Sequence, residues 1–476
     1  MKIARAAFAH ALGAAAFVAA LAGPLAREAH AQTSSPYSDV KKLGIAQSKT
    51  KGGAAHFGHL LALPGVSANA EHVREIEGHA NAVAFFFEAS KPSRQASVIE
   101  ALGPKVAGMV FVNDVFMNAD GASRTPTAIA KNLAALKARL GPKLEAGAIP
   151  YLAFDEPMWL RQMGVCASAG HTGGALADCK ENGPRPEVVA EMRPKLEAWI
   201  DQLRGISTQK LAIVVIEAHP MIRDALELPV NADVYGYDCY EDFEQCSRDR
   251  RNPKVAYSNR QLWNGLKARI EDFNKRFGGH RRMALTVPTT RVFSRANVRA
   301  ETGMSGSAQL VLDRQLAAPT ERPDAASAAL AKRHLDEFAS DPMTLVIGNF
   351  MWNAGQGGDA MWLGARALPE TRALLEQTGR RILGRSGGAN ATAGAPIVDF
   401  VVQSGAIAKR TGAIWTWSST NATTCKSLSD ASLPPLAPNG ALYRGPDAAP
   451  TRLSYTIACT GPGGTTKATV NYASTR

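Results

Sequence analysis

Short apolar runs alternate with longer stretches in which apolar residues recur every three or four positions, from about residue 43 to residue 383. Short continuous runs are typical of strands buried on both faces, and the longer spacing is typical of amphipathic helices. The runs predict eight strands, at residues 43–46, 82–87, 106–112, 149–154, 211–216, 233–237, 283–287 and 344–350. Helices are predicted between them, for example at 127–140, 262–277 and 369–383.

Eight strand–helix units in about 350 residues match the size and rhythm of a (β/α)8 TIM barrel. An open, doubly wound sheet is the main alternative, but no glycine-rich phosphate loop follows the first predicted strand. We therefore expect an α/β TIM barrel over residues 32–384.

The composition changes after this region. Residues 385–396 are rich in Gly and Ala, a small, flexible composition that is typical of a linker. In the tail, Leu453, Tyr455 and Ile457 alternate with polar residues, as strands with one buried face do. Residues 397–476 are thus predicted to form a small all-β sandwich, with Cys425 and Cys459 placed to bridge its two sheets.

Segments 415–425 and 455–464 resemble the immunoglobulin-like modules that are appended to many bacterial exported and surface proteins. The resemblance implies an immunoglobulin-like fold for the tail. It also implies contact with a glycan or a cell surface as one role for this module.

The first 31 residues have the organisation of a signal peptide. Lys2 and Arg5 precede an apolar core at 11–22, and Ala29-His30-Ala31 matches a cleavage site, so the mature chain is expected to begin at Gln32. No other stretch approaches the twenty apolar residues of a membrane-spanning helix. We expect a secreted or periplasmic protein with no transmembrane segment.

Cysteine usage agrees with export. Six cysteines form three close pairs, which are Cys166 with Cys179, Cys239 with Cys246, and Cys425 with Cys459. An even number in an exported chain favours disulfides. No C-x-x-C motif or matching histidine pair accompanies them, so we predict no structural metal, and nothing in the sequence implies a cofactor.

The chain carries a formal charge of +12, of which the signal peptide contributes +2. This charge favours an anionic polysaccharide only weakly. The densest basic clusters, at 248–251 and 280–282, are not interleaved with aromatic residues. Nucleic-acid binding is therefore not expected.

Polar side chains follow the ends of most predicted strands, where the catalytic groups of barrel enzymes lie. The candidates are Glu88, Asn113, Asp114, Asp155, Glu156, Glu217, His219, Tyr237, Asp238, Tyr240, Trp352 and Asn353. Glu156 is the strongest, because an apolar strand delivers it to the rim beside a second acid. Glu88 and Asp114 are more easily explained as a helix cap or an ion-pair partner.

Carboxyl groups at this rim suit the cleavage of glycosidic bonds. One acid must protonate the leaving oxygen, while a second carboxylate attacks the sugar or activates water. We expect Glu156 to be the proton donor, Asp155 to orient or support it, and Glu217 or Asp238 to be the second carboxylate. Separations of about 5 to 5.5 Å or about 6.5 to 9.5 Å would indicate retention or inversion, respectively.

Aromatic residues near the same rim could stack on sugar rings or hydrogen-bond to the substrate. Tyr237, Tyr240 and Trp352 are the candidates. With Glu88, Asn113, Asp114, His219 and Asn353 they form the expected substrate-binding set.

The barrel resembles the clan A glycoside hydrolases. In that clan the fourth strand ends in Asn-Glu-Pro with the Glu as acid/base, and Asp155-Glu156-Pro157 stands in that place. The eighth strand of many members ends in a substrate-stacking Trp, which Trp352 would match. The clan's nucleophilic Glu closes strand seven, whereas segment 285–291 contains no acid.

Three explanations of this difference stay open. Another carboxylate can act as nucleophile, or the substrate's own N-acetyl group can do so, as in hexosaminidases with an adjacent Asp-Glu pair. In the third, the protein is a non-catalytic carbohydrate-binding or surface-interaction protein on a glycosidase-like barrel. A metal-dependent hydrolase is a further alternative, but His56 and His59 do not have the His-x-His spacing of such barrels and are expected at the surface.

Overall fold

The computed structural model describes most of the chain after residue 53. The described residues are 54–62, 68–171, 175–176, 178–179, 183–222, 227–240, 242–248, 255–294, 309–310, 324–353, 355–357, 360–385, 395–407, 410–431, 433, 435–436, 440–444 and 452–473. The signal peptide, the predicted strand at 43–46 and most of the predicted linker lie outside them.

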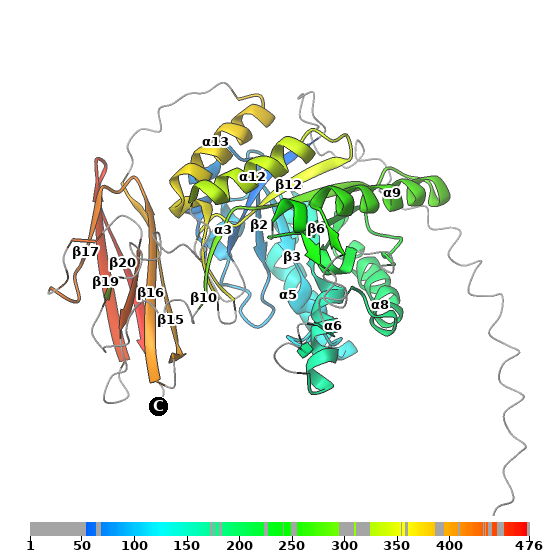
Figure 1. The fold of residues 1–476 in the computed structure, drawn as a ribbon, viewed down its shortest axis with the longest axis horizontal. Helices are drawn as coiled ribbons and strands as arrows, with labels where there is room; N and C mark the ends of the chain where they lie inside the picture. Colours follow the sequence, from blue (N-terminus) through cyan, green and yellow to red (C-terminus); the bar gives the residue numbers. More distant parts are fainter. Residues whose placement is uncertain are drawn as a thin grey trace, which may run out of the picture.

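Eight parallel strands close into a barrel, as the sequence predicts (Figure 1). Around the barrel they follow the order β1, β12, β9, β6, β5, β4, β3 and β2. Their bounds are β1 His56–Ala62, β2 Ala82–Phe86, β3 Ala107–Phe111, β4 Tyr151–Asp155, β5 Ala212–Ala218, β6 Val234–Asp238, β9 Arg282–Pro288 and β12 Thr344–Phe350.

Helices cover the outside of the barrel. They are α2 Ala70–Ile76, α3 Ala96–Ala101, α4 Asn113–Phe116, α5 Pro126–Glu145, α6 Pro157–Ser168, α8 Pro186–Arg204, α9 Asn259–Phe277, α12 Asp324–Phe338 and α13 Pro369–Ile382. The 3₁₀ turns are η2 His219–Ile222, η3 Phe243–Gln245 and η4 Ala365–Ala367. The predicted helices at 127–140, 262–277 and 369–383 correspond to α5, α9 and α13.

The first barrel strand differs from the prediction. The barrel closes with β1 at His56–Ala62, which pairs with β12 and β2, rather than with residues 43–46. The two histidines of β1 are buried, and His56 Nδ1 forms a hydrogen bond of 2.8 Å with the Tyr151 hydroxyl on β4. These polar residues interrupt the apolar run by which strands are recognised in a sequence.

Short strands in the loops of the barrel form two small sheets. The first contains β10 Arg291–Ser294, β13 Gly355–Gly357 and β14 Ala360–Leu363. The second pairs β7 Ser247–Arg248 with β8 Ala256–Tyr257.

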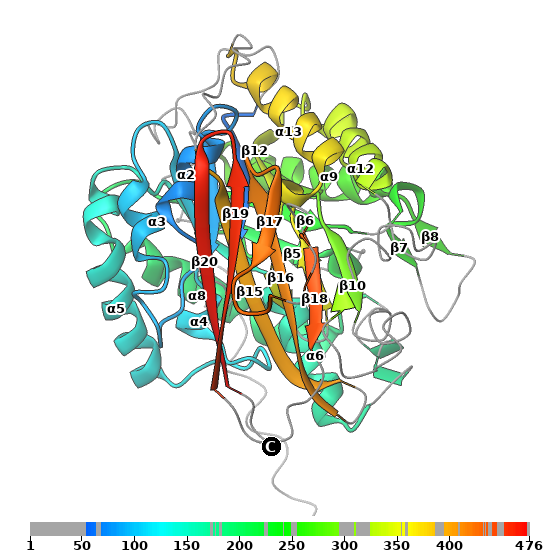
Figure 2. The same cartoon turned by 90° about the vertical axis from the view of Figure 1, so that its left-hand side faces the viewer.

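The C-terminal module contains two antiparallel sheets (Figure 2). One of them also includes β11, which lies between β10 and α12 in the chain and pairs with β18. One has the order β11, β18, β16, β15 and the other the order β17, β19, β20. The bounds are β11 Gln309–Leu310, β15 Ile397–Ile407, β16 Arg410–Thr420, β17 Thr424–Ser427, β18 Gly440–Arg444, β19 Arg452–Gly461 and β20 Gly464–Ala473. Its core includes Trp415, which stacks on Tyr455 at 4.8 Å.

All three predicted disulfides are present, but the third has a different place from the one predicted. Cys425 on β17 and Cys459 on β19 are direct cross-strand partners. The bond therefore joins neighbouring strands of one sheet and does not bridge the two sheets. This differs from the inter-sheet disulfide of antibody domains.

Arg366 connects the barrel with the module. Its buried guanidinium pairs with Glu75 at 2.9 Å and donates a hydrogen bond of 2.6 Å to the carbonyl oxygen of Ile397, where β15 begins. None of the helices in the described part of the chain combines the length and apolar composition of a bilayer-spanning helix.

Candidate active site

A small pocket lies in the barrel where β4, β6 and β12 end, with room for about 30 Å³. Its wall is mainly apolar, with residues such as Leu60, Met109 and Ile216. The polar residues of the wall are Asp155, Asp238, Tyr240, Thr286 and Asn349. The carboxyl rim therefore combines an apolar floor with a few converging polar groups, as ligand sites usually do.

Glu156 occupies an unusual backbone conformation between β4 and α6. Its φ of 49° and ψ of 42° lie in the left-handed helical region of the backbone map, which residues other than Gly, Asn and Asp seldom adopt. The Glu156 N–H donates to the Ile216 carbonyl at 2.6 Å, and the Glu156 carbonyl accepts from Leu160 N–H at 2.9 Å. Pro157 then starts α6, where its missing N–H is harmless. The backbone thus turns sharply at Glu156.

The Glu156 side chain contacts Asp238 across the rim. The two carboxyl groups are joined by a hydrogen bond, and burial with the neighbouring negative charge of Asp238 holds the pKa of Glu156 well above its usual range. Burial raises the pKa of Asp238 only to about 6, because Glu156, the Tyr240 hydroxyl and the His219 backbone N–H stabilise its ionised form. Glu156 is therefore the acid of the pair and Asp238 the carboxylate.

Two more carboxyl groups lie beside this pair. Burial and the charge of Asp238 raise the pKa of Asp155 to about 8. Burial raises the pKa of Glu217 to about 8, although the backbone N–H groups of Met158 and Trp159 lower it. Glu217 Oε1 accepts from Met158 N–H at 3.1 Å, so this carboxyl group sits at the start of α6.

The four acids consequently differ in charge near pH 7. The pKa order leaves Asp238 mainly ionised, while Asp155, Glu156 and Glu217 are mainly protonated. Glu217 is almost fully enclosed, whereas Asp155 and Glu156 keep part of their surface open to solvent. A proton donor that a ligand can reach is thus present at the mouth.

The direct hydrogen bond between Glu156 and Asp238 is shorter than either separation expected for a two-carboxylate glycosidase. The two carboxyl groups of a retaining glycosidase are about 5 to 5.5 Å apart, with the anomeric carbon between them. Those of an inverting enzyme are about 6.5 to 9.5 Å apart, which leaves room for a water molecule. In the observed arrangement Asp238 faces Glu156 itself and leaves no space for a sugar carbon between the two carboxyl groups.

Asn113 lies behind Asp155. Its side-chain amide donates to the Asp155 carbonyl at 2.7 Å and accepts from the Asp155 N–H at 2.8 Å. It holds the end of β4 rather than facing the pocket. Asp114 accepts from Ala89 N–H at 2.7 Å and pairs with Arg124, and Glu88 pairs with Arg94 at 2.6 Å.

The two candidate tyrosines have different places. Tyr240 lines the pocket and its ring packs at 4.9 Å against Phe350 of β12. The Tyr237 hydroxyl donates to the backbone carbonyl of Asn259 on α9 at 2.8 Å. Tyr237 thus faces the helix layer, because successive side chains of a strand point to opposite sides.

Trp352 and Asn353 are buried, with 0% and 1% of their surface exposed. The Trp352 ring packs at 4.5 Å from His59 and 5.2 Å from His79, and the Arg372 guanidinium lies over it at 5.8 Å. This surrounding is a packed layer behind the barrel wall. Neither residue lines the pocket.

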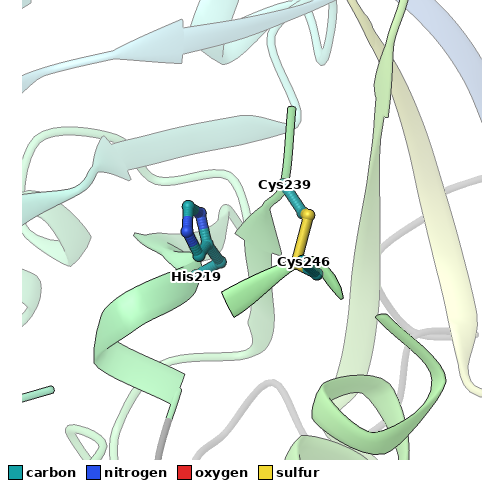
Figure 3. Close-up of side chains that lie close together, drawn as sticks. All are labelled: His219, Cys239 and Cys246. Carbon is teal, nitrogen blue, oxygen red and sulfur yellow. A yellow bond between two sulfur atoms is a disulfide. The ribbon is translucent and has the colours of Figure 1, made fainter. Parts of the chain in front are cut away.

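His219 lies beside the Cys239–Cys246 disulfide (Figure 3). The side-chain ligand atoms of these three residues are within 4.8 Å of one another, which is close enough for a shared metal ion. The two sulfur atoms are bonded to each other, however, so neither is available as a thiolate ligand.

His56 and His59 do not form a joint metal site. His56 contacts Tyr151 of β4 through the barrel interior, whereas His59 packs against Trp352 and His79 outside the wall. Both are buried, so their expected place at the surface was wrong. Alternation along β1 separates the two rings.

Sequence reasoning missed Thr286, which β9 contributes to the pocket in the place where no acid was found. The available signal was the alternation of Ala284 and Thr286 on one face of that strand. This alternation identifies a pocket residue only when the register of β9 against its neighbouring strands is known, and a short apolar run does not reveal that register.

No protein-family model matches the chain, and no curated protein matches its sequence. Solved structures that align with it include three carbohydrate-active enzymes, all with TM-scores below 0.4. A calcium-binding mutant of Bacteroides uniformis β-glucuronidase 2 is 9% identical, with a TM-score of 0.37, 88% of this chain covered and 45% of its own. This chain therefore spans less than half the length of that enzyme.

A modular endo-β-1,4-mannanase of glycoside hydrolase family 26 from Cellulomonas fimi is 12% identical, with a TM-score of 0.37, 92% of this chain covered and 97% of its own. A Parabacteroides merdae β-glucuronidase is 6% identical, with a TM-score of 0.35, 85% of this chain covered and 45% of its own. At such similarity, function has to rest on this chain's own residues.

Proposed function

We propose that this protein is an exported glycoside hydrolase in which Glu156 protonates the leaving oxygen of an oligo- or polysaccharide. The observation that carries the proposal is the hydrogen bond between Glu156 and Asp238. In this pair the pKa of Glu156 is held well above its usual range by burial and the charge of Asp238, whereas that of Asp238 is raised only to about 6, which supports a proton on Glu156 at the rim of the barrel. General acids of glycosidases are held protonated by such surroundings.

The backbone of Glu156 adds independent support. A left-handed backbone at a residue other than glycine costs about 1 kcal/mol or more, and such conformations cluster at functional sites. Glycine would occupy this position without that cost. The presence of Glu favours a role for its side chain.

We propose a route in which the substrate supplies the nucleophile. The carboxyl pair leaves no space for an anomeric carbon, and Glu217 is bound to the start of α6. The carbonyl oxygen of a 2-acetamido group would form a bond to C1 as the C1–O bond breaks, and Glu156 would give its proton to the leaving oxygen. Water would then open the cyclic intermediate, returning a proton to Glu156.

Asp155 has a place in this route. It lines the pocket among apolar residues, where the methyl group of an acetamido substituent would fit, and its carboxyl group could orient the amide. Glu217, at the start of α6, would hold the backbone that carries Glu156.

Export is part of the proposal. The signal-like residues 1–31 support it, and so do three disulfides. The C-terminal module would contact a glycan or a cell surface.

The test is a comparison of wild type with Glu156→Gln on a panel of glycans and aryl glycosides, with and without 2-acetamido groups. Release of reducing ends by the wild type and loss of about 10²- to 10⁴-fold in the variant is the expected result. Glu191→Gln, on α8, is the matched control. Equal activity of wild type and Glu156→Gln would refute the proton-donor role.

If neither protein cleaves a glycan and both bind one, the carbohydrate-binding alternative is correct. Cleavage restricted to 2-acetamido sugars supports the substrate-assisted route. Equal cleavage of sugars that lack this group contradicts it.

A further inference from the structure

The loop that follows β6 bends back onto the strand's last residue. Asp238 ends β6, and the Tyr240 hydroxyl, two residues further on, donates a hydrogen bond to the Asp238 carboxylate. The Tyr240 ring also packs against Phe350 at the end of β12, with the ring centroids 4.9 Å apart. Tyr240 therefore reaches Asp238 from a position set by packing as well as by the chain.

The disulfide between Cys239 and Cys246 closes this loop immediately before Tyr240. Both cysteines are buried, with 2% and 1% of their surface exposed. His219 lies against the disulfide from η2 (Figure 3). Its backbone N–H also donates to Asp238. Two donors from two different segments thus converge on one carboxylate, and the disulfide lies between those segments.

A carboxyl pair that shares one proton keeps it on the partner whose ionised form is less stabilised. Asp238 receives hydrogen bonds from Tyr240 and the His219 backbone, in addition to the one shared with Glu156. The other titratable groups that act on the pair, Asp155 and Glu217, are acids that oppose ionisation. Among the described residues that line the pocket there is no Lys or Arg.

We propose that Tyr240, held by the Cys239–Cys246 disulfide, is a positioning residue that directs the shared proton onto Glu156 by stabilising the Asp238 carboxylate. The importance of Tyr240 for catalysis rests on the proposed function. The position of the proton in the Glu156–Asp238 pair is independent of that function and can be measured without substrate.

The first experiment is an infrared pH titration of the carboxyl groups in the whole protein without substrate, for wild type and Tyr240→Phe. Loss of one hydrogen bond to an ionised group should raise the lower of the two pKa values of the pair by about one pH unit. Tyr235→Phe is the matched control. It removes a buried hydroxyl on β6, which donates to the Pro229 carbonyl at 2.6 Å.

An unchanged lower pKa in folded Tyr240→Phe, judged by near-ultraviolet circular dichroism, would overturn the proposal. The same shift in Tyr235→Phe would overturn it as well, since the effect would then not be specific to Tyr240. This titration gives its answer even if no glycan is cleaved, so the failure of the proposed function is a separate outcome.

The second experiment tests the disulfide in the double variant Cys239→Ala, Cys246→Ala. A shift of the lower pKa in the direction seen for Tyr240→Phe is expected, and an unchanged value contradicts the role of the disulfide. If a glycan is cleaved, the acidic limb of the pH profile of kcat/KM should move upward with the titration. Such a movement distinguishes positioning of the proton from a general loss of folding.

Discussion

The side chain of Asn113 forms two hydrogen bonds with the backbone of Asp155, one to its N–H and one to its carbonyl oxygen. The Asn113 side chain thus takes the place of a backbone partner from β3 at the last residue of β4, beyond the end of the β3–β4 pairing. The residue after Asp155 is Glu156, so Asn113 fixes the starting point of the turn that carries the proposed acid.

Asn113→Ala should lower both stability and activity. It leaves one backbone donor and one acceptor of Asp155 without their partners, and the expected loss is about 1–3 kcal/mol in the free energy of unfolding. Urea denaturation measures it. Asn132→Ala, which removes hydrogen bonds to the carbonyls of Asp114 and Val115, is the control and should lose stability without a comparable loss of activity. Equal losses of activity would show that Asn113 acts only through folding.

The wild-type pH profile should be bell-shaped. Ionisation of Asp238, with a pKa of about 6, sets the acidic limb, because below it the pair holds two protons and Glu156 loses its partner charge. The raised pKa of Glu156 places the basic limb well above the range of an ordinary glutamate. Initial rates at subsaturating substrate measure both limbs. A basic limb near pH 4 to 5 would contradict the assignment of Glu156 as the acid.

Asp155→Asn should stabilise the protein at alkaline pH. The unfolded chain releases the Asp155 proton near pH 4 and the folded one near pH 8, so the free energy of unfolding falls as pH rises through this interval. Because asparagine cannot ionise, the variant should not show this pH-dependent fall in the free energy of unfolding. We expect a melting temperature several degrees higher than wild type at pH 8 and little difference at pH 4.

Thermal melts at both pH values check this expectation, with Asp336→Asn, on the exposed side of α12, as the control. An equal gain at pH 4 and pH 8 would show that ionisation of Asp155 is not the cause.

The Cys425–Cys459 bond should stabilise the C-terminal module. It closes a loop of 34 residues between β17 and β19, and such a loop corresponds to about 3–4 kcal/mol. Replacing both cysteines by Ala should shift the denaturation of the module accordingly. The equivalent replacement of Cys166 and Cys179 should leave this transition in place, because that bond belongs to the barrel.

Mass spectrometry of the exported protein should find Gln32 as its first residue. Ala31→Phe should slow this cleavage, because the site needs small side chains. A mature protein that retains Lys2 and Arg5 would contradict the signal-peptide assignment.

The barrel was predictable from sequence to a large extent, because strands buried on both faces leave continuous apolar runs. Seven of these runs coincide with barrel strands. The eighth did not, because β1 carries His56 and His59, whose burial depends on partners far away in the chain. A single sequence does not show such partners.

The candidate site was predictable in its position along the chain and not in its geometry. Asp155, Glu156 and Asp238 do meet, because they stand at the ends of nearby strands. Glu217, the register partner of Tyr237, lies beside them at the start of α6 and does not line the pocket. Tyr237 lies one residue before the end of β6 and Trp352 two residues after the end of β12, yet both are on the helix side of the wall. The difference is a matter of one residue in register, which reverses the side to which a side chain points.

The hydrogen bond from Arg366 to Ile397 bears on how far the barrel can be regarded as a transferable unit. Glu75 balances the charge of this arginine, and one of its N–H groups donates to the carbonyl oxygen of the first residue of β15. A chain shortened before that residue would lack this acceptor. Evolutionary exchange of the tail for another domain would accordingly have to preserve a backbone carbonyl at that point, whatever side chains the new domain brought.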